Sequence, residues 1–324
     1  MLALDSLLRL PTLEADLARV ETALREAVQA GDPFMTQVAS HLIPAGGKRL
    51  RPALAVCVGS RSATPVSQDV IMGACAVELV HLGSLYHDDV MDEARTRRTV
   101  ESVNARWGNL VAILAGDFLL ARASEIAASL GTEVAGLLAS TIGSLCEGQV
   151  RELSQAYDVG RTEEAYLTAI HGKTAALMAT ACRIGALCAG LERPMVETVT
   201  RYGERVGMVF QIVDDILDVV SSDEELGKPA GNDIVEGVYT LPVIRALKSG
   251  ASADALRALL RRHIEPSEVA EVRRLVRSDG AVPASLDVAR GYAAEACDAL
   301  EGMYGPEMDA LRALTDNLIE NVPA

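Results

Sequence analysis

The distribution of proline is the feature of this sequence that most restricts its fold. No proline occurs between Pro65 and Pro194, and this long stretch is rich in Ala, Leu, Glu and Val. Because proline breaks the interior of a helix, long helices can form where it is missing. Apolar residues recur there at helical spacing, for example at Leu110, Ile113 and Leu114. Alternation with a period of two is nearly absent, so the sequence predicts an all-α fold.

The same periodicity predicts helices along the whole chain. They are expected at residues 12–30, 34–43, 50–60, 67–92, 101–129, 132–155, 162–189, 195–221, 239–248, 252–263, 267–277, 284–303 and 306–321. No internal repeat, Ser/Gly-rich linker or low-complexity segment divides the sequence. The prediction is therefore a single all-helical domain over residues 1–324.

Composition and charge exclude several classes of protein. Lys plus Arg number 30 against 45 Asp plus Glu, which argues against a nucleic-acid binder held by a global basic field. Aromatic residues make up only 3%, which disfavours all-β sandwiches and base-stacking modules. The N-terminus lacks the basic region of a signal peptide, and no run of eighteen uncharged apolar residues occurs. We expect a soluble, cytoplasmic chain without an integral membrane segment.

Two acidic motifs with the same spacing carry the main functional signal. Their members are Asp88, Asp89 and Asp92 in the first motif and Asp214, Asp215 and Asp218 in the second. Each motif places like charges within one helical turn, which costs stability. One isolated copy would usually be a solvated helix face, but here the flanking residues are apolar. The carboxylates are therefore predicted to line a cavity and to need cations.

The chemistry of these motifs favours Mg²⁺. This hard cation prefers oxygen ligands and commonly binds through a few carboxylates together with phosphate oxygens of a substrate. Zinc would need a spacing that the five His and six Cys do not show. Two Asp motifs that face each other would hold a Mg²⁺-bridged diphosphate between two helices.

Two groups of basic residues match that charge. Their members are Lys48, Arg49 and Arg51 after a Gly-Gly turn, and Arg95, Arg97 and Arg98 after the first acidic motif. Surface pairing with neighbouring carboxylates is the alternative interpretation of these arginines, and we accept it for Arg95. For the rest, the pattern predicts two anionic ligands, one bridged by metal and one held by cations alone.

The sequence resembles the trans-isoprenyl diphosphate synthases, also called polyprenyl synthetases. The resemblance lies in GGKRLRP, LVHLGSLYHDDVMDEARTRR, HGKTA, GMVFQIVDDILDV and LGKPAGNDIVEGVYTLP, and from about residue 250 it is one of general character. It implies an isoprenoid synthase-type bundle of long helices around a central cavity. In the reaction that it implies, Mg²⁺ draws the diphosphate from an allylic substrate, the double bond of isopentenyl diphosphate attacks the cation, and proton loss leaves a trans double bond.

The resemblance also implies a role for each site residue. It assigns Mg²⁺ binding to both acidic motifs and isopentenyl diphosphate binding to Lys48, Arg51, His81 and Arg98. It assigns contact with the allylic diphosphate to Arg97, a further diphosphate contact to Lys228, and the steadying of the developing cation and leaving diphosphate to Lys173, Thr174 and Gln211. By itself His81 would be more typical of a core histidine, and its position seven residues before Asp88 is what marks it.

Two positions depart from the family pattern. Many relatives carry Lys where this chain has Val238, and some end in a basic C-terminus that this sequence lacks. Neither difference removes a metal ligand, so activity remains the expectation. Because the family generally forms homodimers through long helices, we expect a homodimer here as well.

Residues near the first motif predict the length of the product. Gly83 and Ser84 stand where farnesyl and geranylgeranyl synthases commonly block the product tunnel with Phe or Tyr. The tunnel is therefore predicted to be open, with close helix packing as the alternative role of these small residues. Phe118, Leu119 or Met178 is the alternative, deeper floor. The expected product is a heptaprenyl to decaprenyl diphosphate, as a quinone side chain requires, and geranylgeranyl diphosphate is the nearest rival.

Two other functions are alternatives to this one. A terpene cyclase shares the helical fold and the first motif, but its second motif is usually of the Asn/Ser/Glu type. A non-catalytic subunit of a heteromeric synthase typically loses its acidic motifs, and both are intact here. The Asp88→Ala substitution separates an elongating enzyme, which would lose turnover while folded, from a subunit that would still support its partner.

Overall fold

The computed structural model describes residues 10–60, 64–226, 229–249, 252–260, 264–278 and 280–322. Within these ranges the regular structure is helical except for one hairpin, in which β1 (Thr96–Arg97) pairs antiparallel with β2 (Val100–Glu101). The all-α prediction is therefore confirmed. The chain groups into two compact units, and the expectation of a single domain stays a prediction.

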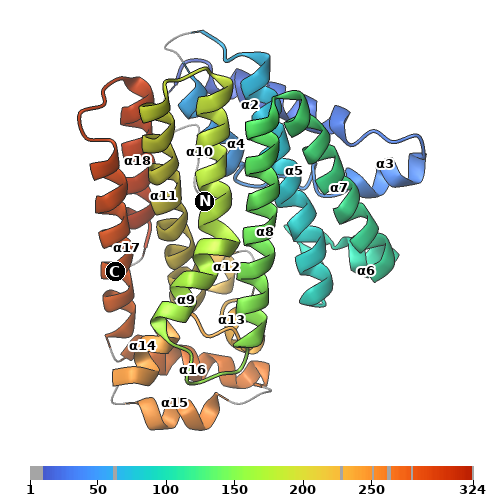
Figure 1. Ribbon diagram of the computed structural model, residues 1–324. Coiled ribbons are helices and arrows are strands. Elements are labelled where there is room, and N and C mark those ends of the chain that lie inside the picture. Colours follow the sequence, from blue (N-terminus) through green and yellow to red (C-terminus); the bar gives the residue numbers. More distant parts are fainter. Residues whose placement is uncertain are drawn as a thin grey trace. The chain divides into compact units, whose positions relative to one another are not determined.

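Unit 1 comprises the described parts of Met1–Ile142, Leu177–Gly203 and Leu300–Leu314. Its helices are α2 (Leu13–Ala27), α3 (Pro33–Ala39), α4 (Leu50–Gly59), α5 (Gln68–Met91), α6 (Val103–Trp107), α7 (Asn109–Ser129) and α10 (Ala176–Cys188). The first parts of α8 (Thr132–Ser154), α11 (Arg193–Val220) and α18 (Pro306–Glu320) also belong to it. Helix α5 packs against α2, α4 and α7, and Figure 1 shows α5 beside α7.

The ends of α5 follow from its sequence. The Ser67 side chain accepts a hydrogen bond from the Val70 N–H at 3.3 Å, which satisfies one of the N–H groups that a helix start leaves without a partner. Apolar residues fill the helix on every side, and most of them are fully buried. Within the described chain, α5 is the one helix long and apolar enough to span a membrane. Of its most apolar window, 72% is buried inside the protein, as in a core helix.

Small residues let the helices of unit 1 approach closely. A Cβ atom built on Gly185 of α10 would lie 2.2 Å from the carbonyl oxygen of Ala55 in α4. On Gly83 of α5 it would lie 3.1 Å from the carbonyl oxygen of Gly116 in α7. These two helix pairs therefore meet backbone to backbone.

Unit 2 comprises the described parts of Gly143–Ala176, Glu204–Ala299 and Thr315–Ala324. Besides the remaining parts of α8, α11 and α18, it contains α9 (Glu163–Ile170), the π-helical turn η1 (His171–Ala175), α12 (Asp223–Leu226), α13 (Asn232–Val235), α14 (Leu241–Ser249), α15 (Ala253–Leu259), α16 (Pro266–Ser278) and α17 (Ala281–Ala299). Its hydrophobic core includes Val219, Ile234, Tyr239, Val243 and Val272, and α14 packs against α15, α16 and α17.

The long predicted helices match the structure closely, but the short helices α12 and α13 were not predicted, and α3 ends at Ala39 rather than at residue 43. Three further differences lie inside predicted segments. Gly108, at a φ of 88°, separates α6 from α7 inside the segment predicted as 101–129. The hairpin β1–β2 precedes α6, so the first residues of that segment are extended. The turn η1 interrupts the helix predicted at 162–189, because a π-helical turn keeps the helical direction and leaves the apolar spacing almost unchanged.

The packing of Gly185 predicts a cost of added volume. We expect Gly185→Ala to lower the free energy of unfolding by about 1–3 kcal/mol, because the new methyl group would collide with backbone. The matched control is Gly136→Ala in α8, where a Cβ meets nothing within 4 Å. It should raise that free energy by about 0.5–1 kcal/mol through helix propensity. Denaturant titration measures both, and equal effects of the two substitutions would contradict the close contact.

Candidate active site

The first acidic motif lies at the C-terminal end of α5 in unit 1. Asp88 and Asp89 occupy the last turn, and Asp92 is the C-cap residue, whose N–H donates to the Asp88 carbonyl at 2.8 Å. The C-terminus of a helix carries partial negative charge and favours cations, so carboxylates there raise the electrostatic energy. This end of α5 therefore favours the binding of a cation.

Asp89 is the buried member of that motif, with no exposed surface. Its Oδ1 accepts hydrogen bonds from Arg97, at 2.7 Å from Nε and 2.6 Å from Nη2. Its Oδ2 is buried and has no hydrogen-bond partner among the described residues. Burial raises the pKa of Asp89, and the charge of Arg97 acts in the opposite direction. A buried carboxylate oxygen without a partner is a position at which a cation would be stabilised.

Three predicted substrate-binding residues come together in unit 1, namely Arg51 of α4, His81 of α5 and Arg98 after β1; we call them the cation cluster. Burial, followed by the charges of Arg51 and Arg98, lowers the pKa of His81 well below its usual value. Burial also lowers the pKa of Arg98. The two arginines and the neutral imidazole come from distant parts of the sequence. Together they form an environment that favours an anion.

A glycine turn supports the cation cluster. Arg98 Nη1 donates a hydrogen bond to the carbonyl oxygen of Gly46. Gly47 has a φ of 136°, and a Cβ there would lie 2.6 Å from Cζ of Arg98. The guanidinium thus rests against a position that only glycine leaves open. Lys48 follows directly and is exposed at the same loop.

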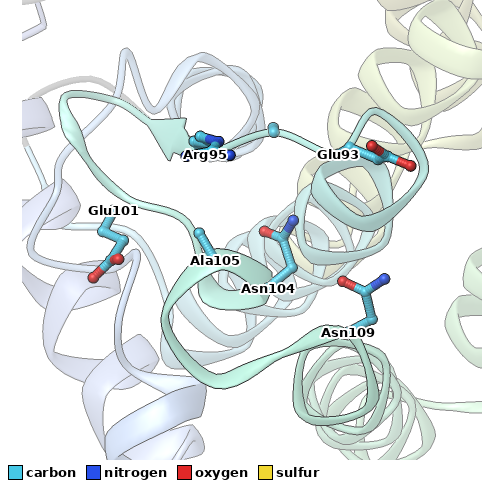
Figure 2. A pocket seen from close by; sticks show the side chains of 7 residues that line it. Glu93, Arg95, Glu101, Asn104, Ala105 and Asn109 are labelled. Atoms are coloured by element: carbon cyan, nitrogen blue, oxygen red, sulfur yellow. The ribbon is translucent and has the colours of Figure 1, made fainter.

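A pocket of about 510 Å³ lies beside the hairpin, and none of the predicted site residues lines it. Figure 2 shows its walls, made of Glu93, Ala94, Arg95, Glu101, Asn104, Ala105 and Asn109. Charges of both signs are present, which does not select an anionic ligand. Two of its lining residues bond to the first motif, since the Asn104 side-chain amide and the Ala94 N–H each donate to the Asp89 carbonyl at 2.9 Å.

The second acidic motif lies near the C-terminal end of α11, in unit 2. Asp214 is half-buried, whereas Asp215 and Asp218 are buried. Asp215 accepts hydrogen bonds from the Tyr166 hydroxyl at 2.5 Å and from Gln211 Nε2 at 2.8 Å. Burial raises the pKa of Asp215 to about 7, although both hydrogen bonds oppose the shift. The motif therefore holds a carboxyl group whose charge depends strongly on its partners.

Of the two predicted catalytic residues in η1, Thr174 is connected to this motif within unit 2, and Lys173 binds Glu152. The Thr174 hydroxyl donates to Gln211 Oε1 at 2.7 Å, so Gln211 links Thr174 to Asp215. Lys173 Nζ lies 2.5 Å from Glu152 Oε1 on α8. Isolated π-helical turns inside α-helices frequently occur at functional sites, because they re-aim successive side chains. Here η1 presents Lys173 and Thr174 to two different polar partners.

The structure thus gathers the predicted residues in two groups, one in each unit. Arg51, His81, Arg97 and Arg98 meet in unit 1, and Lys173, Thr174, Gln211 and Asp215 meet in unit 2. Lys228 lies outside the described residues. Across the ranges that are described, no three His, Cys, Asp or Glu side chains converge as a ready-made metal site. The individual roles of these residues stay predictions.

The three predicted chain-length residues have different surroundings. Gly83 packs against the backbone of α7, which favours the close-packing interpretation of this residue. The Ser84 hydroxyl donates to the His81 carbonyl at 2.9 Å, and Phe118 of α7 is half-buried. The lining of a product tunnel by these residues stays a prediction.

Sequence reasoning missed several polar residues that support the site. They are Glu21 and Glu78, which bind Arg49, and Glu152 and Tyr166, which bind Lys173 and Asp215. Glu78 had a visible signal, because it is a single charge inside the apolar run GACAVELVHLG. Tyr166 and Glu152 had no such signal in the sequence, because their neighbours along the chain are typical of a helix surface.

Comparison with known proteins shows which proteins this chain is similar to. The family model for polyprenyl synthetase matches residues 32–278. Nonaprenyl diphosphate synthase of Mycobacterium tuberculosis is 41% identical over 94% of this chain and 92% of its own length. A polyprenyl synthase structure from Caulobacter crescentus, in complex with calcium and isoprenyl diphosphate, superposes with a TM-score of 0.90 at 33% identity, over 99% of this chain and 98% of its own. A geranylgeranyl pyrophosphate synthase structure from Corynebacterium glutamicum reaches 0.83 at 38% identity, over 96% of each chain.

The pKa of Asp215 predicts how the stability of the metal-free protein depends on pH. Because the folded-state pKa is raised from 3.8 to about 7, the folded state binds the proton more tightly than the unfolded state. This contribution is fully present below the unfolded pKa and is lost as pH rises to about 7, by about 1.4 kcal/mol for each unit of pKa difference. Asp215→Asn should flatten the decline measured by urea unfolding in a chelator. The control is the exposed Asp287→Asn, and an unchanged decline in Asp215→Asn would contradict the shift.

Proposed function

This chain belongs to the polyprenyl synthetase family and is a trans-prenyltransferase, and we propose that it elongates an allylic diphosphate with isopentenyl diphosphate into an all-trans polyprenyl diphosphate. The observation that carries the proposal is the cation cluster, which lies within electrostatic reach of the Asp89–Arg97 pair. One anion-binding environment and one acidic motif then stand together in unit 1. That combination suits two diphosphates: the acidic motif would hold one through a metal ion, and the cation cluster would hold the other without metal.

We propose Mg²⁺ as the cation of the two acidic motifs. The buried Oδ2 of Asp89, without a hydrogen-bond partner in the described chain, fits such a group, as do the carboxylates at the C-terminal end of α5. No ready-made site of three side chains is needed, since Mg²⁺ is commonly held by one or two carboxylates plus phosphate oxygens. When bound, the ion stabilises the negative charge that develops on the leaving diphosphate.

The cation cluster is proposed to bind isopentenyl diphosphate. Because the pKa of His81 is lowered, its imidazole is neutral at pH 7 and can donate one hydrogen bond without adding charge. Arg51 and Arg98 supply planar guanidinium groups suited to phosphate oxygens, and Lys48 adds a flexible ammonium group. Partial burial strengthens these interactions by excluding water. Arg97 is proposed to contact the allylic diphosphate, next to the carboxylate with which it pairs.

In unit 2, the polar side chains are proposed to steady the allylic cation and the leaving group. Thr174 holds Gln211 by its Oε1, and Gln211 in turn binds Asp215, so the amide has a fixed orientation. Fixed dipoles act without reorganisation as charge develops. Lys173, tied to Glu152, is proposed to turn toward the departing diphosphate. Lys228 is proposed as a further diphosphate contact.

We propose a product of heptaprenyl to decaprenyl length, for a quinone side chain. Its support is the small side chain at Ser84 and the likeness to a nonaprenyl synthase at 41% identity. Geranylgeranyl diphosphate is the rival, supported by the likeness to a synthase of that product at 38% identity. A non-catalytic role in a heteromeric enzyme is disfavoured, because both acidic motifs are present.

A single incubation tests activity and product length together. Purified protein, farnesyl diphosphate, labelled isopentenyl diphosphate and Mg²⁺ should yield a ladder of products that extends beyond geranylgeranyl. Asp88→Ala should lower turnover by about 100-fold or more while the protein stays folded. Ser84→Phe should shorten the longest product. A sharp stop at geranylgeranyl would keep the enzyme class and reject the proposed length, and no extension with any allylic primer would reject the activity.

We also propose a homodimer and a cytoplasmic location. Helix α7 carries an exposed apolar strip, with Leu110 79%, Ile113 40% and Leu114 59% exposed. Their spacing places these residues on one face of the helix, and contiguous exposed apolar surface marks sites of protein association. In a family that generally forms homodimers through long helices, a second copy of the chain is the expected partner.

The dimer proposal has a direct test. The double substitution Leu110→Asp and Leu114→Asp should convert the dimer to monomer in analytical ultracentrifugation, since two carboxylates cannot be buried without partners. The control is Tyr304→Asp, at a side chain 89% exposed in the loop before α18, which should leave the dimer intact. A wild-type monomer, or a double variant that stays dimeric, would contradict the proposed surface.

A further inference from the structure

Glu78 is a buried charge to which the proposed mechanism gives no role. It lies in the middle of α5, is 1% exposed, and is surrounded along the helix by buried apolar residues. An ionised carboxylate in such a place is destabilising by several kcal/mol unless it is paired and hydrogen-bonded. The partner that makes its burial tolerable therefore identifies what this charge does.

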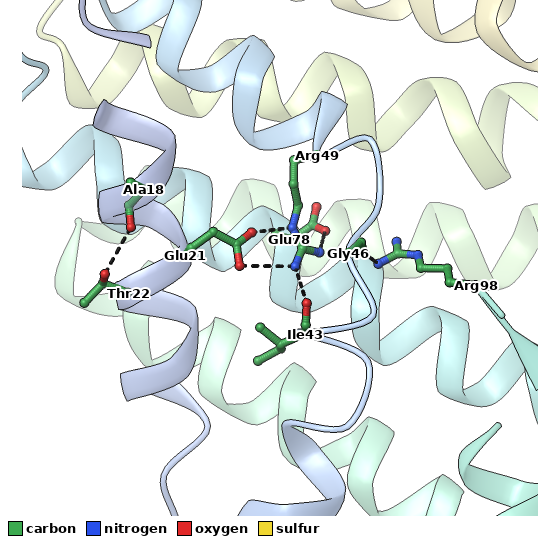
Figure 3. Close-up of polar contacts among 8 residues, drawn as sticks. All are labelled: Ala18, Glu21, Thr22, Ile43, Gly46, Arg49, Glu78 and Arg98. Carbon is green, nitrogen blue, oxygen red and sulfur yellow. Dashed lines mark hydrogen bonds and ion pairs between the residues drawn. The ribbon is translucent and has the colours of Figure 1, made fainter. Parts of the chain in front are cut away.

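That partner is Arg49, the N-cap residue of α4, which follows Lys48 in the loop and precedes Arg51 in the first turn of the helix. Arg49 Nη1 donates to Glu78 Oε1 at 2.8 Å. Its Nε and Nη2 donate to the two carboxylate oxygens of Glu21 on α2, at 2.5 Å and 3.3 Å. Nη2 also donates to the carbonyl oxygen of Ile43 at 2.9 Å. Figure 3 shows these contacts, and we call Glu21, Arg49 and Glu78 the Arg49 triad.

These contacts distinguish Arg49 from the substrate-binding residues on either side of it. Each of its three nitrogen atoms has an acceptor within the protein, and two of the acceptors are carboxylates. A diphosphate would have to displace these carboxylates and would leave Glu78 buried without its cation. Arg49 is thus committed to the fold, although the run GGKRLRP places it between two predicted ligands.

The Arg49 triad also fixes an unusual backbone. Arg49 has a φ of 44°, in the left-handed region that residues other than glycine rarely adopt. Gly46 and Gly47 in the same loop also have positive φ, and Arg98 bonds to the Gly46 carbonyl. A strained conformation persists only when surrounding contacts over-determine it. Here the guanidinium bridges α2, α5 and the Ile43 carbonyl, so the loop between residues 46 and 51 is held at three points.

Glu78 also balances the cation cluster electrostatically. Burial lowers the pKa of Arg51 and of Arg98, and the Glu78 charge raises the pKa of both. It therefore favours the charged form of two guanidinium groups that repel each other. The Glu78 carboxylate thus stabilises the loop through its bond to Arg49. It also stabilises the charges of Arg51 and Arg98 through electrostatic attraction.

We infer that the Arg49 triad is a positioning device that pre-places Lys48, Arg51 and Arg98 for the diphosphate of isopentenyl diphosphate, and that Arg49 itself does not bind the substrate. This inference rests on the proposed function of the cation cluster. It assigns roles to Glu21 and Glu78, two carboxylates that an anion-binding site would ordinarily exclude. Arg rather than Lys is required at residue 49, because an ammonium group cannot reach both carboxylates and a carbonyl in fixed geometry.

The test compares Glu78→Gln, Glu21→Gln and Arg49→Lys with the wild type. We expect each to raise KM for isopentenyl diphosphate by about tenfold, while kcat and KM for farnesyl diphosphate change less than about twofold. Calorimetry with inorganic pyrophosphate in a chelator should show a matching loss of affinity. Glu21 is partly exposed, so Glu21→Gln keeps the test usable where Glu78→Gln fails to fold.

Asp16→Asn is the matched control. Asp16 is a fully buried carboxylate on the same helix as Glu21, and it pairs with Arg19 at 2.8 Å. Arg19 also donates to the Val66 carbonyl and has no contact with the glycine loop among the bonds that the described residues make. Loss of the Asp16 charge should lower the melting temperature of the protein. It should leave KM for isopentenyl diphosphate and KM for farnesyl diphosphate unchanged.

Three results would overturn the inference. One is a fall in stability alone for the triad variants, as in Asp16→Asn. Another is a rise in KM for farnesyl diphosphate as large as the rise in KM for isopentenyl diphosphate. The third is a raised KM in Arg49→Lys with wild-type values in both glutamate variants, which would make Arg49 a substrate ligand. If the wild type does not elongate, the proposed function fails, and the pyrophosphate affinities still decide the inference.

Discussion

The balance of buried charge is the constraint on which both groups of candidate site residues depend. A buried carboxylate is tolerated only where a cation or hydrogen-bond donors meet it. Glu78 is met by Arg49 and Asp89 by Arg97, while Asp215 is met by two neutral donors. Arg49, Arg97 and Tyr166 each come from another element of the same unit, whereas Gln211 lies one turn before Asp215 on α11. These pairings tie loops and a hairpin to the helices, and they set where the remaining cations and carboxylates lie.

Helix ends give the two acidic motifs their chemical character. The first motif lies at the last turn of α5, and Asp218 of the second motif lies in the last turn of α11, where the helix dipole already disfavours negative charge. The carboxylates therefore gain from a cation more than they would in mid-helix. A bound divalent ion with its diphosphate would remove an energetic cost that the fold itself imposes. The site is thus locally unfavourable in isolation, as functional sites often are.

Much of the fold could be predicted because local pattern and global structure agree. The helical periodicity and the proline-free stretch located the long helices, and the boundaries of α5 and α8 lie within one residue of those expected. The differences lie at Gly108, at η1 and in the hairpin, where a few residues change the backbone without changing the apolar spacing, and at α12 and α13, which are too short to show a helical period. The candidate site was predictable to the extent that its residues sit in short motifs with fixed spacing.

The sequence by itself determined the helical class, the family resemblance and the residues that carry opposite charges toward a diphosphate. Those properties depend on spacing along the chain, which sequence records directly. Only the tertiary structure decided that Arg49 binds Glu21 and Glu78 rather than standing with its neighbours as a ligand, and that Tyr166 donates to Asp215. Such choices depend on which side chains from distant segments become buried together. The cost of unpaired buried charge selects among partners that the sequence leaves equivalent.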